Sequence, residues 1–253
     1  MANRAQHSER LSPKDNHLLA ALPAAVFERL HRFMTLTALP LGAVLYESGL
    51  QMRDVYFPVS GLVSLLCVLE DGGTAEIAVV GNDGCVGVSI LLGGGGTPSR
   101  AVVQIAGNAY RVKSNAVLAE FRRGGPAAIV LLRYIQSLMT QMSQTAVCNR
   151  HHTVEHQLCR WLLLSLDRVA SNRIDMTQEL ISTMLGVRRG GITEAARKLQ
   201  AAGLIEHRRG HITVPDRAKL EGHACECYAV LKRETDRLLP RQPVRATSAA
   251  CCS

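Results

Sequence analysis

The segment from Met176 to Val214 constrains the fold of this chain more than any other part, because it combines helical apolar spacing with glycine at the turns. Two sets of apolar residues recur at helical spacing on either side of Gly186: Leu180, Ile181, Met184 and Leu185, then Ile192, Ala195, Ala196 and Leu199. A tight turn between helices favours glycine, which has no Cβ. The pattern predicts two short helices, followed after Gly203 by a hairpin whose tip is Glu206-His207-Arg208-Arg209-Gly210-His211.

The polar face of the second predicted helix carries side chains suited to DNA. A short helix that buries an aliphatic stripe and exposes arginine and small polar residues can enter a major groove. We expect base contacts from Arg188, Arg189, Thr193 and Arg197. Contacts to the DNA backbone are expected from Thr177, Gln178, Arg173, Arg208 and Arg209. The alternative is a small helical subdomain with a solvated basic face; the agreement of turn, caps and charges favours DNA binding.

Charge supports the same interpretation. The chain of 253 residues has a formal net charge of +8, with +3 in residues 1–150 and +5 in the shorter part, residues 151–253. An excess of positive charge beside a helix-turn-helix pattern indicates a polyanionic partner. Hydrophobic residues make up 47% of the chain and aromatic residues only 4%, so the core must be mainly aliphatic.

Neither a membrane segment nor a secretion signal is visible. No apolar run reaches 18 residues, and residues 1–17 are polar and charged, so we expect no membrane association and a cytoplasmic location. The eight cysteines are then expected to be free thiols. We find no nucleophile elbow, HExxH motif or P-loop, and therefore expect no enzymatic activity.

The texture of the chain divides it into five parts. Short β-rich runs alternate with glycine turns between Leu41 and about Lys113, which predicts an α+β protein with an N-terminal β-roll or jelly roll. The predicted strands are Ala43–Tyr46, Val55–Pro58, Leu62–Leu69, Thr74–Val80, Ala101–Ala106 and Ala109–Lys113. The expected parts are a disordered arm (1–15), the β domain (16–125), a long helix with a hinge (126–158), a winged helix-turn-helix (159–240) and a flexible tail (241–253). One last helix is expected from Arg217 to Leu239.

The long helix carries a seam of alternating steps of three and four residues. Leu131, Ile135, Leu138, Met142 and Thr145 follow this spacing, which is typical of a coiled coil. We expect them to form the interface of a homodimer; the alternative is a helix packed on its own β domain. A dimer would present two recognition helices to a palindromic site in double-stranded DNA.

A β-roll, a long helix and a winged helix-turn-helix in this order resemble the Crp/Fnr family of bacterial transcription regulators. The resemblance covers roughly residues 16–240, and it adds RNA polymerase as a further candidate partner. It implies that Arg189 matches the family's base-reading arginine, while Gly190 stands where the family usually has glutamate. The family's best-known DNA half-site is therefore not expected.

The resemblance also implies a cyclic-nucleotide-binding fold for the β domain. The family pairs a Gly-Glu dipeptide with an Arg-Ser or Arg-Thr, and the matching positions of the candidate effector pocket are Gly87, Val88, Ser89, Ser99 and Arg100. Val88 replaces the carboxylate and the Ser-Arg order is inverted, so a standard cyclic AMP site is not expected. The loop Gly93–Gly96 leaves a small-ligand-binding module open as an alternative function.

A metal or redox sensor is the other alternative. Cys148, His152, His156 and Cys159 share one helix face, but four ligands along one helix cannot readily surround a tetrahedral ion, whereas two from each subunit of a dimer could. Cys225-x-Cys227 is spaced more tightly than a usual zinc hook, and Cys251-Cys252 has the character of an oxidisable tail. We therefore expect packed cysteines and solvated histidines here, with no metal and no cofactor.

Overall fold

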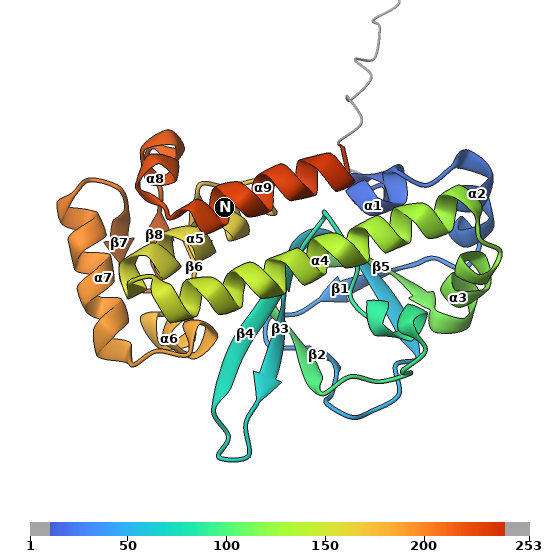
Figure 1. The fold of residues 1–253 in the computed structure, drawn as a ribbon, viewed down its shortest axis with the longest axis horizontal. Coiled ribbons are helices and arrows are strands. Elements are labelled where there is room, and N and C mark those ends of the chain that lie inside the picture. Colours follow the sequence, from blue (N-terminus) through green and yellow to red (C-terminus); the bar gives the residue numbers. More distant parts are fainter. Residues whose placement is uncertain (1–10, 241–253) are drawn as a thin grey trace, which may run out of the picture.

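The computed structural model describes residues 11–240, and its N-terminal part is a β domain (Figure 1). One antiparallel sheet has the strand order β1-β5-β3-β4, and β2 also pairs with β5. The strands are β1 (Thr35–Leu39), β2 (Val44–Tyr46), β3 (Asp54–Val68), β4 (Thr74–Val80) and β5 (Ser99–Lys113). Short helical elements surround the sheet: η1 (Pro13–Asp15), α1 (His17–Ala20), α2 (Ala24–His31), η2 (Val88–Leu92) and α3 (Ser114–Arg122).

Two strands are longer than the sequence pattern predicted. β3 joins the predicted runs Val55–Pro58 and Leu62–Leu69, and β5 joins Ala101–Ala106 and Ala109–Lys113, because the chain passes each glycine in a β-bulge. At this crossing a Cβ on Gly61 would lie 2.5 Å from the carbonyl oxygen of Ile105, and one on Gly107 would lie 2.3 Å from that of Ser60. These glycines bend paired strands and do not end them.

The N-terminal boundary also differs from the expectation of a disordered arm over residues 1–15. Residues 1–10 and the predicted tail 241–253 lie outside the described part of the chain. Ser12 and Asp15, however, form a capping box around η1, and the Tyr110 hydroxyl donates a hydrogen bond to the Leu11 carbonyl oxygen at 2.8 Å. The chain is therefore tied to the β domain from residue 11 onward.

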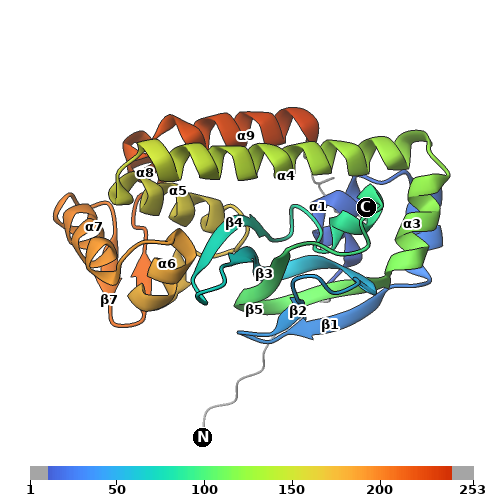
Figure 2. The same cartoon turned by 60° about the horizontal axis from the view of Figure 1, so that its bottom comes forward.

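The long helix α4 (Gly125–His151) spans the molecule, and α9 (Glu226–Leu238) lies antiparallel beside it (Figures 1 and 2). The predicted dimer seam is wrong, because its residues are used inside the protomer. Leu131, Ile135 and Leu138 are buried in the β-domain core, and Met142 packs against that core. Thr145 is buried and accepts a hydrogen bond from Arg160 at 3.1 Å.

The C-terminal domain has its own core around α5 (Val154–Leu166), where Trp161 and a run of leucines are fully buried. It continues through β6 (Arg173–Asp175), α6 (Gln178–Leu185), α7 (Arg189–Ala201), β7 (Glu206–Arg208) and β8 (His211–Thr213). The predicted last helix is two helices, α8 (Arg217–His223) and α9, because the backbone is extended at Ala224 and Cys225. None of the helices between residues 11 and 240 combines the length and apolar character needed to cross a membrane.

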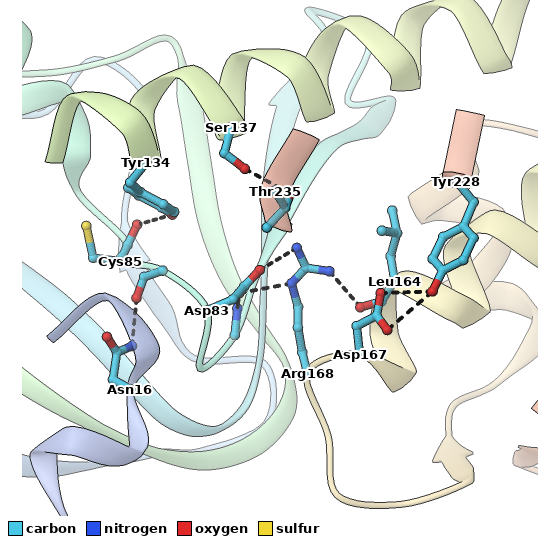
Figure 3. Close-up of polar contacts among 12 residues, drawn as sticks. Asn16, Asp83, Cys85, Tyr134, Ser137, Leu164, Asp167, Arg168, Tyr228 and Thr235 are labelled. Atoms are coloured by element: carbon cyan, nitrogen blue, oxygen red, sulfur yellow. Dashed lines mark hydrogen bonds and ion pairs between the residues drawn. The ribbon is translucent and has the colours of Figure 1, made fainter. Parts of the chain in front are cut away.

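A buried arginine joins the two domains (Figure 3). Arg168, just after α5, forms an ion pair with Asp83 of the β domain at 2.7 Å, and it also donates to the Leu164 carbonyl oxygen at 2.7 Å. Leu62 and Val79 of the sheet pack into the core of the C-terminal domain. The C-terminal domain is therefore docked on the β domain through both apolar and ionic contacts.

Candidate nucleic-acid interface

The helices α6 and α7 lie on either side of Gly186, and α7 ends before Gly203, as the sequence predicted. The Thr177 hydroxyl caps α6 by accepting a hydrogen bond from the Leu180 backbone N–H at 3.2 Å. Gly186 ends α6 with φ of 64°, a left-handed conformation that suits glycine. The apolar residues Ile192, Ala195, Ala196 and Leu199 of α7 are all buried, so the opposite face of α7 is turned outward.

The outward face of α7 and the hairpin present arginines without internal partners. The five arginines of this set are exposed, and within residues 11–240 none of them forms an ion pair: Arg188, Arg189, Arg197, Arg208 and Arg209. They lie at the end of the molecule that is farthest from α3 (Figure 1). Guanidinium groups with no carboxylate partner are free to bind phosphate or the edge of a guanine. We name this set, with Thr193, the arginine face.

Partners are already present for Thr193 and for the remaining predicted contact residues Gln178, Arg173 and Thr177. The Thr193 hydroxyl lies 2.9 Å from Oε1 of Gln178, which fixes α7 against the start of α6. Arg173 pairs with Asp175 at 2.7 Å, although both side chains are largely exposed. Thr177 acts as a helix cap, so its hydroxyl positions α6 as well as lying at the surface.

The hairpin is held by a contact that the sequence did not reveal. Strands β6, β8 and β7 form a small antiparallel sheet, with Arg209 and Gly210 in the turn between β7 and β8. The Gln200 side chain of α7 accepts a hydrogen bond from the His207 backbone N–H at 2.9 Å. Gln200 therefore sets the hairpin relative to α7, which gives the pair of elements the geometry of a winged helix-turn-helix.

The two glycines of the recognition helix lie in its first turn. Arg188 is the N-cap, so Gly190 and Gly191 are the second and third helical residues. The Gly191 backbone N–H donates a hydrogen bond to the carbonyl oxygen of Arg188 at 2.9 Å, so the first turn is closed in spite of the two glycines. A Cβ on Gly190 would meet nothing within 4 Å.

The predicted effector positions are not assembled into one polar site. Gly87 adopts a left-handed conformation (φ 103°), and Val88 is buried in the β-domain core. The buried Ser99 hydroxyl lies 3.1 Å from Thr97 and 3.4 Å from Tyr46. The Arg100 side chain lies on the face of β5 opposite to Ser99, as alternation along a strand requires. It pairs with Glu47 at 2.7 Å.

The β domain also has a hollow away from the predicted effector positions. It has a volume of about 650 Å³ and is open to solvent between α2 and α3, with Arg32, Phe33 and Lys113 among its lining residues. Glu120 in its wall is already paired with Arg29 at 2.7 Å. This hollow does not include any of the five predicted effector positions.

The predicted stripe of cysteine and histidine separates into two groups. Cys148 and His152 lie with Cys225 and Cys227, and their ligand atoms are all within 4.8 Å of one another. Cys159 is instead buried in the core of the C-terminal domain, and the nearest contacts of His156 are Thr153 and the rings of other histidines. The sequence singled out both pairs but did not bring them together, because Cys148 and Cys225 are 77 positions apart along the chain.

Sequence reasoning also missed an apolar stripe on the outer face of α4. Ile129, Leu132, Met139 and Val147 are 47–61% exposed. They lie on one face of the helix, at separations of three, seven and eight residues. We name them the outer stripe; a second apolar periodicity in the sequence of α4 was the signal that could have revealed it.

Known domain families match both parts of the chain. Residues 36–123 match the cyclic nucleotide-binding domain, and residues 156–222 match the Crp-like helix-turn-helix domain. Together these matches cover more than half of the chain. No curated protein sequence matches it.

Solved structures show the same fold at low sequence identity. A putative Crp/Fnr-family regulator from Eubacterium rectale is 16% identical with a TM-score of 0.64, covering 85% of this chain and 97% of its own. FixK2 from Bradyrhizobium japonicum is 18% identical with a TM-score of 0.66, covering 76% and 98%. The c-di-GMP-responsive regulator CLP from Xanthomonas campestris is 15% identical with a TM-score of 0.60, covering 76% and 99%. The two matched domains, in this order and with this fold, show that the chain belongs to the Crp/Fnr family of transcriptional regulators.

Proposed function

We propose that this regulator binds a specific, palindromic DNA sequence as a homodimer and does not respond to cyclic nucleotides at the family's standard site. The observation that carries the proposal is the arginine face, in which five exposed arginines on α7 and the hairpin have no internal ion pair. Elsewhere in the C-terminal domain, arginines such as Arg168 and Arg217 are paired with carboxylates. Unpaired cations gathered on a helix and a wing suit a polyanion with a groove.

The arginine face is tested by comparing two of its members. The site is first selected from random duplexes with the wild-type protein. Arg189→Ala is expected to lose about 1–3 kcal/mol on that site and to relax its sequence preference, because a base-reading contact is removed. Arg209→Ala is expected to weaken binding to all duplexes alike and to lower the salt dependence by about one counterion, because a phosphate contact is removed.

Arg122→Ala is the matched control. Arg122 is an exposed arginine of α3, at the other end of the molecule, and its substitution should change neither affinity nor salt dependence. Equal losses for Arg189→Ala and Arg209→Ala on selected and random duplexes would refute the division into base-reading and phosphate contacts.

For the dimer we infer that the outer stripe of α4 is the contact between protomers. Four large apolar side chains remain largely exposed on one helix face in the protomer. Met139→Lys is expected to give a monomer in size-exclusion chromatography with light scattering. The control Leu41→Lys alters an apolar residue of the β domain with similar exposure, and it should stay dimeric.

The sensor part of the proposal rests on the contacts of Val88, Ser99 and Arg100. Val88 cannot accept a hydrogen bond from a ribose hydroxyl, and Arg100 is paired with Glu47. Millimolar cyclic AMP is therefore expected to leave the melting temperature and the DNA affinity unchanged. A rise in melting temperature that Arg100→Ala abolishes would show that the site binds cyclic nucleotides after all.

A further inference from the structure

Three thiols and an imidazole meet where α4 ends and α9 begins. Cys148 lies in the last turn of α4 and His152 is its C-cap, while Cys225 is the N-cap of α9 and Cys227 lies in its first turn. The antiparallel packing of the two helices brings these ends together. All four ligand atoms lie within 4.8 Å of one another.

The spacing of these atoms suits one tetrahedral metal ion. The Sγ atoms of Cys148 and Cys225 are 3.7 Å apart, and Sγ of Cys227 is 3.6 Å from Nδ1 of His152. With zinc bonds of about 2.3 Å to sulfur and 2.0 Å to nitrogen, ligand atoms around one ion lie roughly 3.5–3.8 Å apart. A disulfide would instead need sulfur atoms about 2.0 Å apart. A two-iron cluster would need the ligands in two pairs, one for each iron, and not in a single group.

The surroundings of the four residues match those of a metal centre. Nε2 of His152 lies 3.4 Å from a carboxylate oxygen of Glu226, so Nδ1 is left to face the thiols. Metal-binding histidines commonly direct their second nitrogen to a carboxylate in this way. The Arg160 guanidinium lies beside Cys148 and is almost wholly buried. Three thiolates, a neutral imidazole and a divalent ion carry a charge of −1, which a neighbouring arginine balances.

We propose that Cys148, His152, Cys225 and Cys227 bind one Zn²⁺ ion per protomer in a closed site. Thiolates and imidazole together are a ligand set that zinc favours. The three cysteines are 8% exposed or less, and four protein ligands leave no position for a substrate, so the ion has a structural role. It clips the end of α4 to the start of α9, at the point where the long helix passes into the C-terminal domain.

Metal content is the first test. The full-length protein is purified anaerobically, with Cys251→Ser and Cys252→Ser as background so that these two thiols, which lie outside the described residues, do not contribute. About one zinc per protomer is expected. Cys227→Ser and His152→Ala should lose most of it, whereas Cys67→Ser and Cys159→Ser should keep it, because those thiols lie outside the cluster.

Cobalt substitution is the second test, and it does not depend on a cysteine variant that folds. Co²⁺ added to the metal-free protein should give the visible absorption of a tetrahedral, thiolate-ligated ion, and His152→Ala should change this spectrum by replacing a nitrogen ligand. Removal of the metal by a chelator should lower the melting temperature of the wild-type background and not that of Cys227→Ser.

Three results would overturn the zinc site. The first is a metal content near zero together with no cobalt absorption. The second is an equal metal content in cluster and control variants. The third is a protein mass lower by two hydrogens that places a disulfide between Cys148 and Cys225. Both tests are performed without DNA. Their failure would therefore leave the proposed DNA binding standing, and loss of DNA binding would not remove the zinc site.

Discussion

The two ends of the C-terminal domain use arginine in opposite ways. At the outer end, the arginine face is exposed and has no internal ion pair. At the junction with the β domain, Arg160 and Arg168 are only 3% and 6% exposed, and each is held by partners such as Thr145 and Asp83. Exposed, unpaired arginines gathered on one helix and its neighbouring hairpin indicate a role toward another molecule, whereas buried arginines held by partners within the protomer indicate a role in the architecture.

The same contrast separates the arginine face from the sensor positions of the β domain. Arg100 is the one arginine among the five predicted effector residues, and it already pairs with Glu47. A phosphate would have to compete with that carboxylate, which it would not have to do at Arg189. Family membership alone therefore says less about the ligand of each domain than the partners of its charged groups do.

The largest effect is expected at the domain junction. Arg168→Met removes the partner of Asp83 while keeping most of the side-chain volume, and it should lower the free energy of unfolding by about 3 kcal/mol, since breaking a buried pair leaves a charge uncompensated. Denaturant unfolding measures the change.

Arg237→Met is the control for that experiment, because Arg237 pairs with Glu234 at the surface, where such pairs contribute little to stability. If both variants lost the same stability, the junction would be no more than a surface contact, and the contrast between the two ends would disappear.

Glu76 of β4 gives the second effect, which depends on pH. Its carboxyl is buried and accepts a hydrogen bond from the Ser64 hydroxyl, and burial raises its pKa from 4.5 to about 7. The folded state therefore binds this proton more tightly than the unfolded state does. Its contribution to stability is greatest below pH 4.5 and falls as the pH rises from about 4.5 to about 7.

Glu76→Gln should remove that pH dependence, because an amide keeps the polar contact without a charge. At pH 8 the variant should be more stable than the wild type by as much as about 3 kcal/mol, at 1.36 kcal/mol for each pKa unit. Glu70→Gln, at an exposed carboxyl, should leave the pH profile unchanged. An unchanged profile in Glu76→Gln would show that this carboxyl is ionised in the fold.

Sequence reasoning succeeded where a feature is local and failed where it depends on a partner. The turn at Gly186 and the bounds of β4 follow from short patterns, and the structure confirms them. The sequence of α4 carries two apolar stripes, and only the packing of the β domain decides which one is buried.

The C-terminal helices and the cysteine cluster show the same limit. The break between α8 and α9 falls at Ala224-Cys225, two residues after Gly222 and with no proline beside it. Cys148 and Cys225 come together only because α9 folds back along α4. No pattern within a window of the sequence carries that information.

The smallest effect is expected in the helix-turn-helix that carries the arginine face, where substitutions of two glycines should change stability in opposite directions. Gly190→Ala should raise stability by up to about 0.5–1 kcal/mol, because its Cβ meets open space and alanine favours the helix. Gly186→Ala should lower stability by about 1–2 kcal/mol, because φ of 64° is unfavourable for a residue with a Cβ. Thermal unfolding of the two variants measures both changes in stability.

The added methyl group of Gly190→Ala also lies on the surface assigned to DNA. If this variant gains stability but loses affinity for the selected duplex, that surface lies in the groove. Unchanged affinity would restrict the contact to the neighbouring arginines.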